Sequence, residues 1–168
     1  MLGSLLERKK IRNDFESHFN KLISLVDNEM DTVKKLFDIQ KTLKDDTDEI
    51  VVQRNMPKVA GTLKWCQELK DRATVPFESM KKLDYRIFDM NSEKIERIEK
   101  KYKELLMLID GFSSDVYNEW CIQVGELSND NLKKNLITRN QKDKSIGTNF
   151  NPQLIAVLKE VKYLKFFK

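Results

Sequence analysis

Apolar residues recur at helical spacing along the stretch from residue 92 to residue 127. They follow one another at alternating steps of three and four: Ile95, Ile98, Tyr102, Leu105, Ile109, Phe112 and Val116. This spacing forms the heptad seam of a helix that packs lengthwise against another helix. Charged residues of both signs fill the positions between them, so only one stripe is available for packing. The pattern therefore predicts a long helix over residues 92–127 that must dock on a neighbour.

The stretch from residue 5 to residue 43 shows a second long helical pattern. Its main face consists of apolar residues at similar steps: Phe15, Phe19, Leu22, Val26, Met30, Val33 and Phe37. Further apolar positions widen this face beyond a two-helix seam: Ile11, Ile23, Leu36 and Ile39. Such a helix is roughly 58 Å long at about 1.5 Å per residue, whereas a compact domain of this chain length has a diameter of about 40 Å. We therefore expect an all-α fold, an elongated bundle of long antiparallel helices that is a segment of a longer rod.

Prolines mark the shorter predicted helices. Residues 44–56 form a polar linker, and Pro57 then takes the first-turn position of a helix over residues 57–73. Pro76 in the same way begins a helix over residues 76–90.

The pattern changes after the second long helix. Short β-like runs on both sides of a polar turn predict a small β-hairpin within residues 134–150, near the C-terminus. Asn151 and Pro152 then cap a helix over residues 151–168, which we interpret as the start of the next helical bundle. Its apolar residues are expected to point inward: Leu154, Val157, Leu158, Val161 and Leu164. Its lysines are expected to face solvent rather than a membrane or an acidic partner: Lys159, Lys162, Lys165 and Lys168.

Composition limits the function classes. The 168 residues carry 31 basic and 27 acidic side chains, a net charge of +4, and the basic residues are scattered among acids, so nucleic acid is not an expected partner. Cys66 and Cys121 each adjoin a tryptophan within a helical pattern, and we expect two buried thiols in a reducing cytoplasm rather than a disulfide. No apolar run approaches the roughly 20 residues that span a bilayer.

No set of residues supports catalysis or ligand binding. The glycines lack the context of a phosphate-binding loop. His18 is the only histidine, which excludes a histidine-based triad, and we expect it on the surface or in a groove. The acidic cluster at residues 45–49 lacks the glycine and final glutamate of a calcium loop, so a solvated linker explains it better. We therefore expect no catalytic residue, cofactor, metal or small-molecule substrate, and no enzymatic activity in this segment.

Several ordered motifs resemble a known family. The first runs from Asn55 to Trp65 as NMPKVAGTLKW, followed by Leu69, Arg72 and Pro76. Further matches follow in order: Tyr117 to Trp120, Leu132 to Arg139, Asn149 to Leu154, and Glu160 to Leu164. Together they resemble the tail of dynein heavy chains, in N-terminal region 1, and most closely that of axonemal outer-arm chains. The chain departs from the family's usual residue at Lys58, Thr148 and Asn151. The family-signature residues are taken as structural: Pro57, Gly61, Trp65, Pro76, Trp120, Arg139, Asn149, Phe150 and Pro152.

The resemblance implies a non-catalytic role in a motor protein. Such a tail transmits force and assembles heavy, intermediate and light chains for microtubule-based ciliary movement, while ATP hydrolysis belongs to a distant part of the polypeptide. The implied partners are dynein intermediate and light chains, other heavy chains and axonemal docking proteins. The implied location is the cytoplasm and cytoskeleton, in the ciliary axoneme. One alternative stays open from the residues alone: an independent helical-bundle adaptor that binds a partner peptide or helix in a groove.

Overall fold

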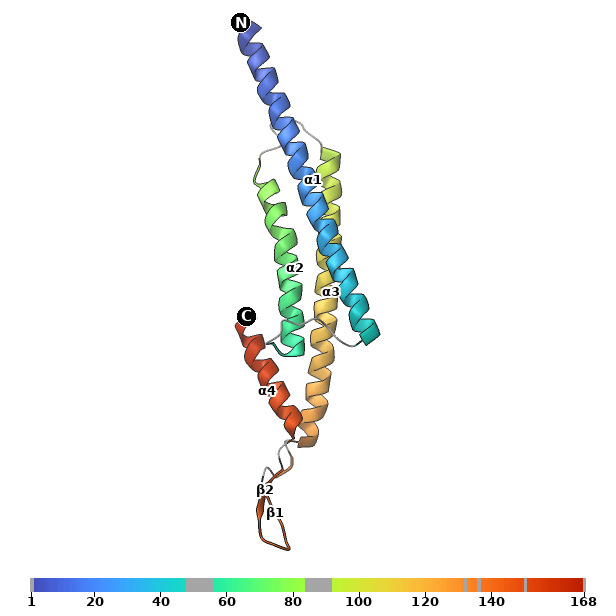
Figure 1. Ribbon diagram of the computed structural model, residues 1–168, viewed down its shortest axis with the longest axis vertical. Helices are drawn as coiled ribbons and strands as arrows, with labels where there is room; N and C mark the ends of the chain where they lie inside the picture. The colour runs from blue at the N-terminus through green and yellow to red at the C-terminus, as the bar shows by residue number, and fades with distance from the viewer. Residues whose placement is uncertain are drawn as a thin grey trace. The chain divides into compact units, whose positions relative to one another are not determined.

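The computed structural model describes residues 2–47, 56–83, 92–131, 133–135, 137–149 and 151–167. Within these residues the chain forms helices α1 (Leu2–Thr47), α2 (Lys58–Lys81), α3 (Ser92–Asn131) and α4 (Pro152–Leu164). Two short strands, β1 (Ile137–Arg139) and β2 (Ile146–Thr148), precede α4, and a 3-10 turn, η2 (Lys165–Phe167), follows it (Figure 1). The predicted all-α bundle with a small hairpin near the C-terminus is confirmed.

The chain divides into two compact units. Unit 1 comprises Met1–Glu49 and Gln67–Asp110, and unit 2 comprises Ile50–Cys66 and Gly111–Lys168. Helices α2 and α3 therefore supply residues to both units. Each unit is described by itself.

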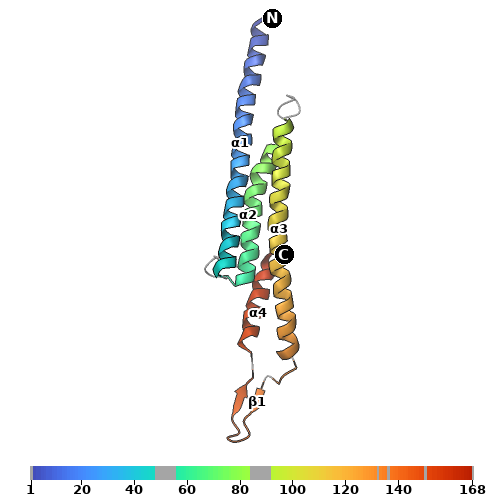
Figure 2. The same ribbon diagram turned by 90° about the vertical axis from the view of Figure 1, so that its right-hand side faces the viewer.

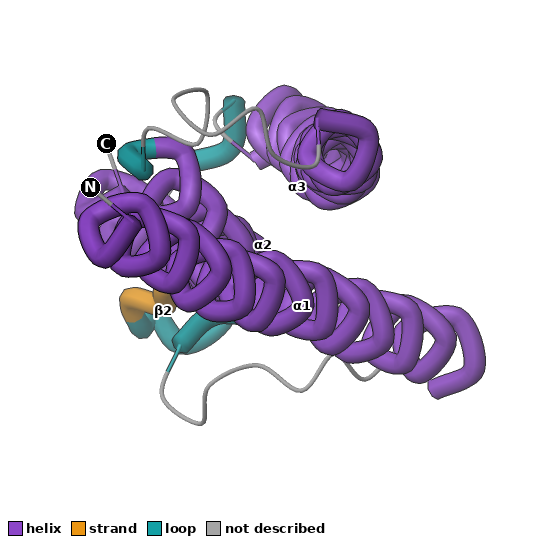
Figure 3. The backbone as a smooth tube through the Cα atoms, turned by 90° about the horizontal axis from the view of Figure 1, so that it is seen from above, coloured by secondary structure: helices purple, strands orange, loops and turns teal. Residues whose placement is uncertain are grey.

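Unit 1 is a three-helix bundle of α1, the later part of α2 and the first part of α3 (Figures 1 and 2). The chain runs in the same direction along α1 and α3 and in the opposite direction along α2. Figure 3 shows the bundle from above, almost down the axis of α3. Helix α1 extends obliquely across this view, so α1 is inclined to α3. The core consists of residues from all three helices: Phe19, Ile23, Val26, Met30, Val33, Phe37, Leu69, Ala73, Phe77, Met80, Ile95, Ile98, Leu105 and Ile109.

The wider apolar face predicted for α1 is covered only in part. Ile23 is buried, but Ile11, Leu36 and Ile39 are exposed, as is Leu25. The three-helix core contacts one stripe of α1. Ile11, Leu36 and Ile39 lie on other sides of this helix and therefore remain exposed.

Helix α2 corrects the prediction made from Pro76. The pattern predicted one helix ending at residue 73 and another beginning at Pro76, but α2 continues through this proline to Lys81. An interior proline removes one helical hydrogen bond and costs about 3 kcal/mol. Ala73, Phe77 and Met80 are all buried on the same face of α2, and their burial favours a continuous helix.

Other helix ends also differ from the prediction. Helix α1 continues to Thr47 instead of residue 43, and α3 continues to Asn131 instead of residue 127. The helix predicted over residues 76–90 ends earlier than expected, because residues 82 and 83 form a turn after α2. The rest of that prediction, residues 84–90, lies outside the described residues, as does most of the predicted linker.

Unit 2 contains the hairpin and α4. The strands are antiparallel, with Ile137 opposite Thr148 and Arg139 opposite Ile146, and every strand residue is exposed. Helix α4 begins as predicted, since the Asn151 side chain accepts a hydrogen bond from the backbone N–H of Gln153.

Two residues of unit 2 contradict the predicted burial. Leu158 was expected to point inward but is exposed, because α4 turns its lysine-bearing side and Leu158 toward solvent. Cys121 is also exposed, whereas Cys66 is buried as predicted. Trp120 is half-buried, and one residue further along a helix lies about 100° around it, which places Cys121 on the open side.

Candidate functional site

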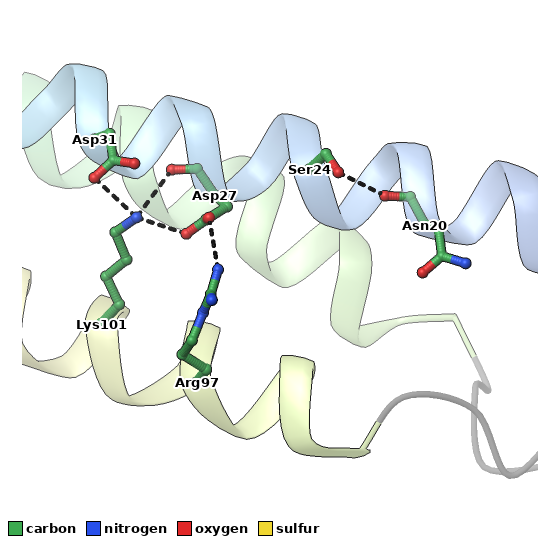
Figure 4. A network of polar contacts seen from close by, with 6 residues as sticks. All are labelled: Asn20, Ser24, Asp27, Asp31, Arg97 and Lys101. Atoms are coloured by element: carbon green, nitrogen blue, oxygen red, sulfur yellow. Dashed lines mark hydrogen bonds and ion pairs between the residues drawn. The ribbon is translucent and has the colours of Figure 1, made fainter.

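Four charged residues join α1 to α3 in unit 1, and we call them the charge cluster: Asp27, Asp31, Arg97 and Lys101. The Nζ of Lys101 lies 2.5 Å from Oδ1 of Asp27 and 2.8 Å from Oδ1 of Asp31. The Nη2 of Arg97 lies 3.1 Å from Oδ2 of Asp27. Figure 4 shows the ammonium group of Lys101 between the two carboxylates of α1. Two cations of α3 thus face two anions of α1.

These contacts alter proton affinities. The hydrogen bond from Lys101 lowers the pKa of Asp27; partial burial opposes this shift, and the positive charges of Lys101 and Arg97 reinforce it. Burial alone would lower the pKa of Lys101, but hydrogen bonds to Asp27 and Asp31 outweigh it and raise that pKa. Each group is therefore held in its charged form, which suits an ion pair and not a proton-transfer site.

The charge cluster sets the register of α1 against α3. Further along the same pair of helices, Lys94 donates a hydrogen bond to Oδ1 of Asn20 at 3.3 Å. In Figure 4, Ser24 lies between Asn20 and Asp27 along α1, and its hydroxyl donates to the Asn20 carbonyl within the helix. A cavity of about 170 Å³ beside these residues is bordered by charges of both signs. Sliding α1 along α3 would break the contacts of Lys94, Arg97 and Lys101 with α1 together.

Tyr102 joins α3 to α2 in the same unit. Its ring stacks on Phe77 with centroids 4.0 Å apart, and its hydroxyl lies 3.0 Å from Oγ1 of Thr74. The Nζ of Lys81 lies over the Phe77 ring, 5.1 Å from its centroid. Further cross-helix ion pairs join Lys70 to Asp110 and Arg72 to Glu29. All three helices of unit 1 are therefore linked to each other by polar contacts around the apolar core.

In unit 2, a buried carboxylate binds the start of α2. Oε1 of Glu160 accepts a hydrogen bond from the Val59 N–H at 2.9 Å, and Oε2 accepts one from the Ala60 N–H at 2.8 Å. These amides belong to the first turn of α2, which has no internal partner for them. Glu160, on α4, is only 8% exposed. A negative charge at a helix N-terminus is favourable, so Glu160 fastens α4 to α2.

This role of Glu160 was not predicted from the sequence. It lies among the inward-facing positions of α4, next to Val161 and three residues after Val157, where an acidic residue is unusual. That placement was the available signal. Its partner amides are about 100 residues away in the chain, so no local pattern indicates them.

The family-signature residues at the start of α2 occupy structural positions. Pro57 immediately precedes α2, and its carbonyl accepts a hydrogen bond from the Gly61 N–H at 2.8 Å. Gly61 is buried and Trp65 is half-buried. Pro76 is half-buried within α2. Their roles remain predictions.

The later signature residues lie at separate places in unit 2. Trp120 is half-buried, and its ring centroid lies 5.8 Å from that of Tyr117. Arg139 is exposed in β1 and Asn149 donates to the Asn135 carbonyl at 3.2 Å. Pro152 is the first residue of α4, while Phe150 lies outside the described residues. Of these residues, the ones that the structure describes do not form a single site.

The described residues also bear on metal binding and membrane insertion. No group of three or more histidine, cysteine, aspartate or glutamate side chains in that part of the chain is arranged to hold a metal ion. None of the described helices is both long and apolar enough to cross a membrane.

Comparison with known proteins identifies the family. A family model described as "Dynein heavy chain, N-terminal region 1" matches residues 1–168. The chain belongs to this dynein heavy chain family. Its dynein relatives include the ciliary dynein beta chains of Tripneustes gratilla and Heliocidaris crassispina, at 37% and 38% identity over 97% of this chain. Dynein axonemal heavy chain 9 of Homo sapiens is 35% identical over the same share.

The matched dynein region is small compared with the whole relatives. This chain spans about 4% of the length of each of these three heavy chains. The match lies in the N-terminal tail region and not in the motor domain. The predicted resemblance to axonemal outer-arm dynein heavy chains is confirmed.

Proposed function

We propose that this segment is a non-catalytic scaffold in the tail of an axonemal dynein heavy chain. It transmits force and supports the assembly of heavy, intermediate and light chains for ciliary movement. The observation that supports this proposal is the set of ion pairs that joins α1 to α3 in the charge cluster, beside a continuous apolar core.

The mechanical part of the proposal follows from helix packing. A long helix bends easily when alone, but a core of interlocked side chains gives the bundle discrete registers and opposes sliding. The charge cluster adds a penalty for slippage, because moving α1 by one turn would leave partly buried charges without partners. Displacement applied at one end of unit 1 is then passed along the bundle instead of being absorbed.

The assembly part of the proposal rests on the family. We propose dynein intermediate and light chains, other heavy chains and axonemal docking proteins as partners, in the cytoskeleton of the cilium. The complete polypeptide would be an ATP-driven microtubule motor whose catalytic ring lies outside this segment.

A matched pair of variants in the full-length heavy chain tests this proposal. Met30→Asp places a charge in the core of unit 1, whereas Leu25→Asp places the same charge at a position that is 66% exposed. Met30→Asp should reduce copurification of intermediate chains and slow microtubule gliding while ATP hydrolysis continues. Leu25→Asp should leave core packing intact and serve as the control. Normal subunit content and gliding speed in the Met30→Asp heavy chain would contradict the proposal.

A further inference from the structure

A groove opens between the start of α2 and one side of α4, within unit 2. Its volume is about 630 Å³, within the range of sites that bind small or peptide ligands. Its lining includes the apolar residues Met56, Pro57 and Ala156 and the aromatic residue Tyr163. Figures 1 and 2 show α4 beside the first turn of α2, as the hydrogen bonds of Glu160 require.

The charged residues of the groove are mostly basic. Lys58 lies on the α2 side, and Lys159 and Lys162 lie on α4. Residues three apart on a helix are neighbours on its surface, so Lys159 and Lys162 form one basic edge. Both are exposed, and neither forms an ion pair with another residue in the described part of the chain.

The one acidic group in the lining does not cancel this charge. Both oxygens of Glu160 already accept hydrogen bonds from the amides of α2, and the side chain is buried. Its negative charge is directed at the helix N-terminus instead of the open groove. An approaching ligand therefore meets the two exposed ammonium groups of Lys159 and Lys162 beside the apolar lining.

We propose that this groove binds a short acidic peptide segment of a partner protein, with an apolar side chain between its carboxylates. The carboxylates pair with Lys159 and Lys162, and the apolar side chain lies on Pro57 and Tyr163. Charge complementarity selects an acidic partner, and the apolar floor favours a peptide over a small inorganic anion. This inference rests on the proposed assembly function, because that function supplies the partner.

A binding measurement on the complete 168-residue chain tests the inference. The probe is a fluorescent peptide, Asp-Glu-Leu-Asp-Glu, compared by anisotropy with Asn-Gln-Leu-Asn-Gln at the same salt concentration. The chain should bind the acidic peptide and not the neutral one. K159E/K162E should weaken acidic-peptide binding at least about tenfold, because two attractive charges become repulsive. The same variant should gain binding to Lys-Arg-Leu-Lys-Arg, and an unchanged far-UV circular dichroism spectrum should verify that it is folded.

A matched control and a second variant sharpen the test. K133E/K134E makes the same change in net charge at exposed positions outside the groove lining, and it should alter binding by less than about twofold. Ala156→Trp should fill the groove and weaken binding without any change in charge. Equal losses in the two charge variants, or no binding by the unaltered chain, would overturn the inference. Binding to phosphatidylserine vesicles through Lys159 and Lys162, with no peptide binding, would also overturn it. Peptide binding involves neither subunit assembly nor gliding, so its failure is distinguishable from failure of the scaffold function.

Discussion

Glu160 is the residue whose removal we expect to affect unit 2 most specifically. Glu160→Ala leaves the Val59 and Ala60 amides without their acceptor, and loss of a helix N-cap acceptor costs about 0.5–2 kcal/mol. Glu160→Gln retains one amide-accepting oxygen and should be less destabilising. Urea unfolding followed by circular dichroism measures the free-energy change.

Glu119→Ala is the control for Glu160→Ala, because Glu119 is an exposed acid of α3 in the same unit. It should change the free energy of unfolding by less than about 0.5 kcal/mol. If both alanine variants unfolded at the same urea concentration as the unaltered chain, Glu160 would not hold α4 to α2.

Asp27 makes stability depend on acid. Its pKa in the folded chain is below the ordinary value of 3.8, so the unfolded chain binds the proton more readily. The stability contributed by Asp27 is therefore present above pH 3.8 and is lost as the pH falls through the lower, folded-state pKa. Asp27→Asn removes the titrating group, so the stability difference between the two proteins should shrink below pH 3.8.

Unfolding free energies between pH 6 and pH 2 test this behaviour. Lys101 provides a second test at the alkaline end of the pH range. Because its pKa is raised in the folded chain, the stability that it contributes should be lost as the pH rises through the folded-state pKa. A constant difference between the unaltered chain and Asp27→Asn across the acid range would show that the charge cluster does not link proton binding to folding.

Individual core residues were largely predictable, whereas individual polar contacts were not. The apolar spacing correctly indicated burial of Met30, Ile98 and Ile109, because helical periodicity places such residues on one face. The pairing of Asp27 with Lys101 and of Glu160 with the α2 amides depends on packing between distant segments. Charge scattered along a helix does not reveal which charge meets which partner.

At the scale of elements, Pro76 gives the clearest test. If α2 is continuous, as the structure shows, Pro76→Ala restores a donor for the Arg72 carbonyl and removes a steric conflict. The variant should raise the free energy of unfolding by about 1–2 kcal/mol, measured by urea denaturation. Val75→Ala, at a neighbouring exposed position, is the control and should be close to neutral.

The opposite result for Pro76→Ala would support a helix that begins at this proline. Proline is favourable in the first turn, so its replacement there would be neutral or destabilising. The sequence could not separate these possibilities, because proline is common at helix starts. Local patterns also do not show that the residues before and after Pro76 are buried on the same helix face. The hairpin and α4 were predictable because turn residues and the Asn-Pro cap act locally.

At the scale of the whole molecule, the sequence indicated class and family more readily than arrangement. Long heptad stripes predicted helices that need neighbours, and ordered motifs identified the dynein tail family. The division into two units, with α2 and α3 contributing to both, could not be predicted, because the stripe of α3 continues through the boundary without a break. The groove between α2 and α4 could not be predicted either, since the residues that line it, such as Lys58 and Lys162, are far apart in the chain.

The most direct test of force transmission is to stretch this 168-residue segment by its two ends in an optical trap. Its extension is recorded up to the stall force of the full-length dynein in the same instrument. We predict that the segment keeps a constant folded length over this range, and that Met30→Asp lengthens at a lower force than Leu25→Asp. Stepwise lengthening of the unaltered segment below the stall force would contradict the account, because a tail that unfolds under the motor's own load cannot pass displacement to its anchor.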